Sequence, residues 1–171
     1  MLKAYRCLIC GETYLGETAS DRCPFCGAAG KHLVAAAEWI PHGKVALSEQ
    51  SYQDCQKALE LELENMAFYQ CAAKKTTNQI MQAYFKRLAK QEGEHAEVLC
   101  KMMGIDEPAP PSVTCPDNDH DNMEGAHKRE DEAVQFYQEV ANRASEARVQ
   151  EVFRALTEIE AEHLIISSIY R

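Results

Sequence analysis

Residues 88–99 read Leu-Ala-Lys-Gln-Glu-Gly-Glu-His-Ala-Glu-Val-Leu, and they combine a helical apolar spacing with metal-binding residue types. Leu88, Glu92, His95 and Leu99 recur at intervals of three and four, which places them on one face of an α-helix. A glutamate and a histidine three residues apart on one face can address the same metal ion. A single pair of this kind is common on solvated helices, so its meaning depends on the rest of the chain.

An internal repeat returns the same pattern 68 residues later. The residue pairs that share this separation are Glu62 and Glu130, Phe68 and Phe136, Tyr69 and Tyr137, Glu92 and Glu160, and His95 and His163. Five matches in one frame predict two similar helical hairpins rather than a coincidence between glutamate-rich helices.

Capping residues and breaks predict where the helices lie. Ser48 is a suitable N-cap for a helix that runs to about residue 75, and Thr76 or Thr77 could cap a second helix that ends near Gly104. A proline-rich connection of about sixteen residues follows, and helices resume near residue 121, break near Ser145 and run on to the end. The sequence therefore predicts a four-helix bundle of two hairpins joined by a long crossover.

One carboxylate interrupts the apolar stripe of every predicted helix. Four buried glutamates would each cost several kcal/mol unless cations neutralise them, and the central positions contain no lysine or arginine. Two divalent ions would balance them, and carboxylate with imidazole suits iron or manganese. This is the ligand set of ferritin-like di-metal bundles, and its predicted members are Glu62, Glu92, His95, Glu130, Glu160 and His163. Tyr69 and Tyr137 fall on the same stripes, where they either pack in the core or donate a hydrogen bond to a ligand carboxylate.

The first 36 residues contain two Cys-x-x-Cys pairs, Cys7 with Cys10 and Cys23 with Cys26, each followed by a glycine. Two such turns present four sulfurs to one tetrahedral ion. A segment this short cannot fold on apolar burial alone, so the metal must supply much of its stability. Spacing does not distinguish a structural zinc from an electron-carrying iron. We expect a metal domain over residues 1–36, a linker over 37–47 and the bundle over 48–171.

Composition narrows the function classes. The formal net charge of −9 makes nucleic acid and anionic membranes poor partners, and the apolar stretches are too short to span a bilayer. Without an export signal we expect a cytoplasmic protein whose cysteines serve metal or redox chemistry rather than disulfides.

The remaining cysteines and one histidine carry weaker signals. We expect Cys55, Cys71 and Cys100 to be buried single thiols and Cys115 to be a loop residue. His127, one turn before Glu130, either reaches a metal or lies beside the ligands.

The motifs together resemble a known family. The turns Tyr5-Arg6-Cys7-Leu8-Ile9-Cys10-Gly11 and Cys23-Pro24-Phe25-Cys26-Gly27 resemble those of rubredoxins, and the whole chain resembles rubrerythrins with the domain order of their better-known members reversed. This resemblance implies one iron, or zinc, on the four cysteines and two irons, or manganese or zinc, on the six bundle ligands. It implies reduction of hydrogen peroxide to water, with electrons from NAD(P)H passing through a reductase or rubredoxin to the rubredoxin-like centre.

The sequence departs from the family at one position. Rubrerythrins usually carry a further carboxylate one turn from the third-helix glutamate, whereas the residues here are Ala126, His127, Ala133 and Val134. The ligand set is therefore closer to a plain six-residue site. Reduction of O₂ and oxidation of Fe(II) for iron handling stand as alternatives to peroxide reduction, and a zinc-ribbon scaffold is a third.

The linker length suggests an assembly. Glu62 lies about fourteen residues into the first helix, so the di-metal site would be about 20 Å along the axis from the start of that helix. The linker of about eleven residues could span up to about 35 Å, but the end of the bundle offers no evident surface to receive the metal domain. We therefore expect a head-to-tail homodimer in which electrons pass between chains.

Overall fold

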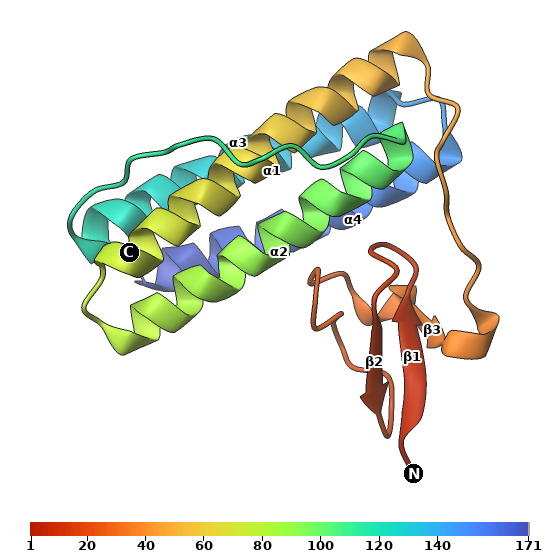
Figure 1. Ribbon diagram of the computed structural model, residues 1–171, viewed down its shortest axis with the longest axis horizontal. Coiled ribbons are helices and arrows are strands. Elements are labelled where there is room, and N and C mark those ends of the chain that lie inside the picture. Colours follow the sequence, from red (N-terminus) through yellow and green to blue (C-terminus); the bar gives the residue numbers. More distant parts are fainter. Residues whose placement is uncertain (171) are drawn as a thin grey trace.

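The computed structural model describes residues 1–170, which form a bundle of four long helices and a small N-terminal sheet (Figure 1). The helices are α1 (Glu49–Lys75), α2 (Gln79–Met103), α3 (Asp119–Arg143) and α4 (Ala147–Tyr170). α1 packs along α2 and α3 along α4, and the segment between α2 and α3 runs back along the bundle (Figure 1). The predicted pair of hairpins joined by a crossover is confirmed.

Side-chain caps set the helix ends. The Ser48 hydroxyl accepts from the backbone N–H of Ser51, as predicted. The cap predicted for α2 was wrong: Thr76 ends α1, and the side chain of Asn78 accepts from the first turn of α2. Gly104 ends that helix with a φ of 67°. Asn118 caps α3 in the same way, and the helix therefore begins two residues earlier than expected.

The N-terminal module is built on three antiparallel strands in the order β2-β1-β3. They are β1 (Lys3–Cys7), β2 (Thr13–Gly16) and β3 (Leu33–Ala35), with short 3-10 turns at Gly30–His32 and Ala36–Glu38. Gly11 and Gly27 both have a φ of 83°, a conformation that a side chain would strain. The two glycines let the chain turn tightly after each cysteine pair.

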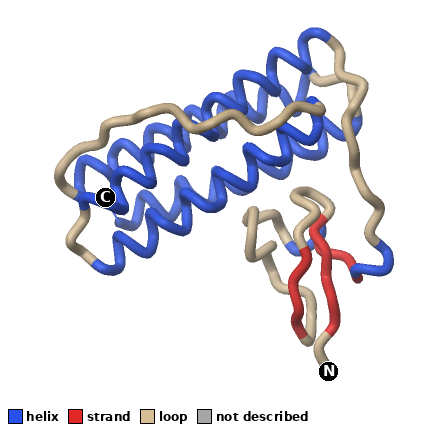
Figure 2. The backbone as a smooth tube through the Cα atoms, in the orientation of Figure 1, coloured by secondary structure: helices blue, strands red, loops and turns tan. Residues whose placement is uncertain are grey.

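The module packs against the middle of its own bundle, because the linker folds back from the start of α1 (Figure 2). On α4, the guanidinium of Arg148 donates to the carbonyl oxygens of Leu8 and Ile9 at 2.8 and 2.9 Å. On α2, Arg87 donates to the carbonyl oxygens of Pro24 and Phe25. The linker folds back so that the module rests on the side of its own bundle rather than at an end. The reason given for electron transfer between chains is therefore removed.

No helix within residues 1–170 is long and apolar enough to cross a membrane.

Candidate metal centres and the contact between them

The bundle brings together all six predicted carboxylate and histidine ligands, each of them buried. They form two overlapping groups whose candidate ligand atoms lie within 4.8 Å of one another: Glu62, Glu92, His95 and Glu160, and Glu92, Glu130, Glu160 and His163. Glu92 and Glu160 belong to both groups. The geometry therefore suits two ions with these two carboxylates between them, and we call this the di-metal site.

Both imidazoles turn the same nitrogen towards the carboxylates. The Nδ1 atom of His95 lies 3.1 to 3.4 Å from oxygens of Glu62, Glu92 and Glu160. The Nδ1 atom of His163 lies 2.8 to 3.8 Å from oxygens of Glu92, Glu130 and Glu160. Each histidine thus presents one nitrogen as a metal donor at the centre of its own group.

Several buried carboxylate oxygens of the ligand glutamates lack well-aligned hydrogen bonds, which indicates whether cations fit this site. Among the described residues, both carboxylate oxygens of Glu92, the Oε2 of Glu130 and the Oε1 of Glu160 are buried without a well-aligned hydrogen bond, and a histidine Nδ1 at 3.1 to 3.8 Å is near each of them. Buried carboxylate oxygens without partners are destabilising, whereas divalent cations would satisfy them with the carboxylate and imidazole donors that iron and manganese accept. The residues fit a pair of metal ions.

The pKa values of the ligand residues also indicate that the di-metal site needs positive charge. Burial, followed by the charges of neighbouring glutamates, raises the pKa of Glu92 well above its usual value and that of Glu130 to about 8. Burial alone would lower the pKa of His95, but the charge of Glu62 and hydrogen bonds to carboxylates raise it well above the ordinary value. Protons thus take the place of metal cations, and metal loading must release them.

Both tyrosines of the repeat make hydrogen bonds to ligand carboxylates and do not only pack in the core. The hydroxyl of Tyr137 donates to Glu62 Oε1 at 2.6 Å, and that of Tyr69 donates to Glu130 Oε1. Burial and the nearby carboxylates raise both tyrosine pKa values well above the usual range, so both hydroxyls remain protonated donors. Each tyrosine orients a carboxylate of the opposite hairpin.

The outer nitrogens of the histidines have different partners. The Nε2 of His163 lies 2.8 Å from Gln91 Oε1, and the Nε2 of His95 lies 2.8 Å from the carbonyl oxygen of Cys26. Because both partners are acceptors, each Nε2 keeps its proton, and release of the proton at Nδ1 would leave that nitrogen free for a metal. The sequence did not reveal these partners, since the internal repeat pairs Gln91 with Ile159 and backbone atoms leave no sequence signal.

The four predicted cysteines of the N-terminal module converge as a second centre, which we call the four-cysteine site. All four are buried, and the sulfur atoms are 3.8 Å apart between Cys7 and Cys26 and between Cys10 and Cys23. The backbone N–H of Ile9 points at the Cys7 sulfur, 3.4 Å away. Four sulfurs at this separation can surround a single tetrahedral ion.

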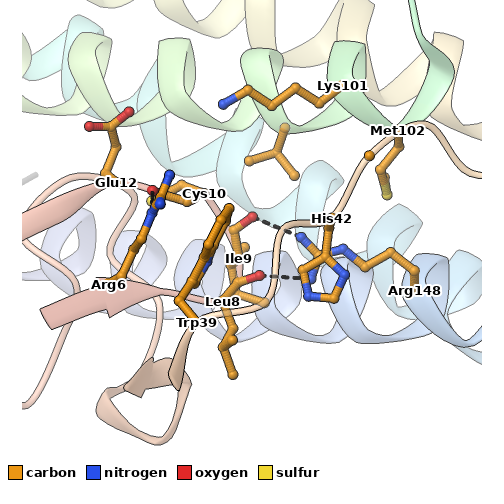
Figure 3. Close-up of a pocket in the computed structure, with 13 residues that line it drawn as sticks. Arg6, Leu8, Ile9, Cys10, Glu12, Trp39, His42, Lys101, Met102 and Arg148 are labelled. Atoms are coloured by element: carbon orange, nitrogen blue, oxygen red, sulfur yellow. Dashed lines mark hydrogen bonds between the residues drawn. The ribbon is translucent and has the colours of Figure 1, made fainter. Parts of the chain in front are cut away.

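A cavity of about 240 Å³ opens beside the four-cysteine site, between the module and the bundle (Figure 3). Cys10 lines it, and the guanidinium of Arg6 lies over the Trp39 ring at 3.5 Å. Lys101 and Arg148 line its bundle side. Glu12 lines it as well, and Lys101 and Arg148 form ion pairs with Glu97 and Glu151, so the cavity beside Cys10 carries charges of both signs. Cys26, in contrast, contacts the candidate ligand His95 through its carbonyl oxygen.

Other sequence-based expectations have mixed outcomes. His127 lies outside both ligand groups, and its Nδ1 is 2.9 Å from the hydroxyl of Ser167. Cys55 and Cys100 are buried free thiols, as expected. Cys115 lies in the crossover loop, as expected. The expectation that Cys71 is a single thiol was wrong, as was the expectation that the cysteines form no disulfide, because Cys71 and Cys115 are bonded to each other. The crossover brings together residues 44 apart in sequence, a proximity that cysteine spacing does not encode.

Two family comparisons cover both parts of the chain. The family described as Rubrerythrin matches residues 55–166, and that described as Rubrerythrin, rubredoxin-like domain matches residues 5–33. Reverse rubrerythrin-1 of Clostridium acetobutylicum is 26% identical over 115 residues, which are 60% of this chain and 63% of that protein. The chain thus matches less than two thirds of that relative's length.

A solved structure shares the fold. The Hypothetical Protein Pfu-1136390-001 from Pyrococcus furiosus superposes with a TM-score of 0.61 at 20% sequence identity. The match covers 70% of this chain and 86% of that one. At this identity the similarity supports the architecture alone.

Proposed function

The chain belongs to the rubrerythrin family, whose members are oxidoreductases, and from this premise we propose that it reduces hydrogen peroxide to water. The reaction would take place at the di-metal site, with electrons delivered from the four-cysteine site. One observation carries the proposal most directly: the 2.8 Å hydrogen bond between the Nε2 of His95 and the carbonyl oxygen of Cys26. It joins a candidate ligand of one centre to a candidate ligand residue of the other.

Iron is the metal that suits this role in both sites. Cys7, Cys10, Cys23 and Cys26 would hold one ion, and the six bundle residues would hold two. Bound iron would supply the electrons that a peroxide needs for cleavage of its O–O bond. Zinc in the four-cysteine site is redox-inactive, so no electron could pass from that site through the contact with His95.

The protein's own residues position and isolate the chemistry. Tyr69 orients Glu130 and Tyr137 orients Glu62, and each of these carboxylates belongs to one ligand group. Glu92 and Glu160 belong to both groups, so both ions would share them. The hydrogen bonds at the outer histidine nitrogens keep each Nδ1 directed at its group. Burial of all six residues separates the reaction from bulk water.

The electron donor would act at the cavity beside Cys10. Three cationic side chains, Arg6, Lys101 and Arg148, line this cavity together with Glu12. The cations would receive acidic groups of a redox partner such as a rubredoxin, or of a reductase that draws on NAD(P)H. Electrons would then cross the module from Cys10 to Cys26.

Rapid mixing tests the proposed substrate. The protein with iron in all sites is reduced anaerobically and mixed with peroxide or with O₂ while the iron absorption is followed. We expect peroxide to reoxidise the di-metal site faster than O₂ does at equal concentration. Equal or slower reaction with peroxide would reject it as the substrate. A matched preparation with zinc in the four-cysteine site keeps the fold and should lose only donor-driven turnover.

Oxidation of Fe(II) with O₂ is a second candidate, favoured by one observation. Within the part of the chain that the structure describes, Glu130 is flanked one turn away by buried Ala126 and Ala133, and neither metal group contains a further carboxylate. This function would not need the four-cysteine site. Sustained turnover of added Fe(II), equally fast with zinc or iron in the four-cysteine site, would support it over peroxide reduction.

A further inference from the structure

The Cys71–Cys115 disulfide joins α1 to the crossover, and the metal chemistry described above does not use it. We propose that these two cysteines form a second redox site, whose dithiol is oxidised by hydroperoxides and whose disulfide is reduced by small thiols. The idea depends on the proposed function only in taking the same oxidant, and it needs no metal.

The two sulfurs would remain neighbours after reduction. Lys75 donates to the carbonyl oxygen of Cys115 at 2.7 Å and to Asp117 at 2.6 Å, which holds the crossover on α1 independently of the disulfide. Cys115 also belongs to a buried cluster against which Cys71 and Val113 pack. The disulfide can therefore open and close while the crossover stays folded against α1, and no loop has to close again from a disordered state.

Cys71 is the more exposed of the two residues and the one that lines a groove. Cys71 is half-buried and lines an open groove of about 350 Å³, together with Gln70, Lys74, Lys75, Pro111 and Ser112. Cys115 is 7% exposed and does not line this groove. Small oxidants and thiols would thus reach Cys71 first, which makes Cys71 the attacking thiol and Cys115 the resolving one.

Charge at the groove supports the reactive form of Cys71. Lys74 and Lys75 follow it by three and four residues, so all three lie on one face of α1. An ammonium group near a thiol favours the thiolate, which is the nucleophile, and offsets the negative end of the helix. Lys74 would supply this charge, because the ammonium of Lys75 is paired with Asp117. Cys55 and Cys100 lack this setting, since burial raises their pKa values to about 12 and about 11.

The chemistry balances with peroxide as the oxidant. The Cys71 thiolate attacks one peroxide oxygen, the O–O bond breaks, and a sulfenic acid and water form after one proton is taken up. The Cys115 thiol then displaces the hydroxyl, which leaves as a second water when the disulfide closes. Two thiols lose two electrons and peroxide gains them. In the return step, an external thiolate attacks the Cys71 sulfur and the Cys115 thiolate leaves and takes up a proton. A second external thiolate then attacks the external sulfur of the mixed disulfide, which frees Cys71 and releases the two external thiols as their own disulfide.

Peptide mapping of the folded full-length protein tests the pair. The protein is treated with dithiothreitol, desalted, exposed to hydrogen peroxide, quenched with N-ethylmaleimide and digested. We expect dithiothreitol to open the disulfide in the native protein and peroxide to close it at least about tenfold faster than it oxidises Cys55 or Cys100. In Cys115→Ser, a dimedone adduct should accumulate on Cys71, whereas Cys71→Ser should leave Cys115 largely unmodified. Cys55→Ser is the matched control and should behave as the unsubstituted protein.

Three results would overturn the proposal. A disulfide that dithiothreitol opens only after unfolding would be purely structural. A reduced pair that peroxide oxidises no faster than Cys55 would have no special reactivity. Loss of peroxide-driven closure in the Glu92→Gln/Glu160→Gln double variant would assign the oxidation to the di-metal site. If that variant closes the disulfide normally while its metal-dependent peroxide reduction is lost, the two sites are independent.

Discussion

At the scale of single residues, two crossed hydrogen bonds tie the halves of the repeat together at the di-metal site. Tyr69 of the first hairpin holds Glu130 of the second, and Tyr137 of the second holds Glu62 of the first. Hydrogen bonds to ligating carboxylates fix the orientation in which their oxygens meet a metal. The tyrosines therefore belong to the site although they are not in either ligand group.

Removal of one tyrosine hydroxyl should weaken metal binding. We expect Tyr137→Phe to reduce the affinity for one of the two bundle ions by about 10- to 100-fold, because Glu62 loses its orienting donor. Titration with Co(II), followed by absorption, measures this affinity. Tyr84→Phe is the control, since the buried hydroxyl of Tyr84 has no hydrogen-bond partner within residues 1–170. Equal affinities in the two variants would contradict the proposed role.

The sequence predicts the ligands better than it predicts their surroundings. Glu92 and His95 were identifiable because charge on an apolar stripe needs compensation, and the 68-residue repeat supplied a second instance. Gln91 and the Cys26 carbonyl were not identifiable, because the repeat does not extend to them. Gln91 corresponds to Ile159, and both side chains lie close to Gly27, which belongs to the module. The repeat is broken where the module docks.

At the scale of helices, the start of α1 is held by the turn between α3 and α4. Glu146 accepts from the backbone N–H of Ser48 and from the Ser51 hydroxyl, each at 2.6 Å. These hydrogen bonds outweigh partial burial and lower the pKa of Glu146 to about 2. Folding therefore stabilises the charged form of the Glu146 side chain.

This contact should give a defined pH dependence. The folded-state pKa of Glu146, about 2, is below the value of about 4.3 in an unfolded chain, so its stabilisation is complete above about pH 5 and is lost as pH falls towards 2. We expect Glu146→Gln to lower the free energy of unfolding by about 1 kcal/mol or less near pH 7, because solvent screens a partly exposed group. Urea unfolding measures it. The difference from the unsubstituted protein should shrink below pH 4, whereas exposed Glu139→Gln should change little at either pH.

Capping and crossover path illustrate what local sequence leaves open. Thr76, Thr77 and Asn78 are all acceptable N-caps, and only the tertiary position of α2 selects Asn78. The Cys71–Cys115 disulfide depends on where a proline-rich segment lies against α1, which neither periodicity nor spacing specifies. Helix existence follows from local pattern, but long connections do not.

At the scale of the whole molecule, the central feature is that the four-cysteine module rests on its own di-metal bundle. The sequence predicted both parts, but the linker length permitted more than one placement of the module. Arg148 decides much of the observed placement, because its guanidinium donates to the backbone of the first metal-binding turn. A bridging arginine on a helix surface has no distinctive sequence pattern.

Loss of this arginine should loosen the module without affecting the ligands. We expect Arg148→Ala to leave the metal content unchanged and to slow electron passage from the four-cysteine site by about tenfold or more, since the contact with His95 is no longer held. Arg154→Ala, an exposed arginine on the same helix, is the control. Stopped-flow spectroscopy of the peroxide-driven oxidation of the four-cysteine site provides the rate. Unchanged rates in Arg148→Ala would show that docking does not depend on this residue.

Electron passage within one chain also predicts the behaviour of mixed variants. Cys10→Ala disables the four-cysteine site and Glu92→Ala disables the di-metal site, so neither chain has a complete route. We expect no recovery of donor-driven turnover when the two are mixed, even after confirmed subunit exchange in any oligomer. Recovery would show that electrons pass between chains, as a head-to-tail dimer requires.

The most direct test of the central claim follows both centres after a single addition of peroxide. The fully reduced, iron-loaded protein is mixed anaerobically with less than one equivalent of hydrogen peroxide, and the absorption of each site is recorded. The intramolecular route predicts that the di-metal site is oxidised first. Oxidation of the four-cysteine site should then follow at a rate that does not change with protein concentration. Two results would contradict electron transfer through the His95–Cys26 contact. One is a four-cysteine site that stays reduced, and the other is a rate of oxidation of this site that rises in proportion to protein concentration.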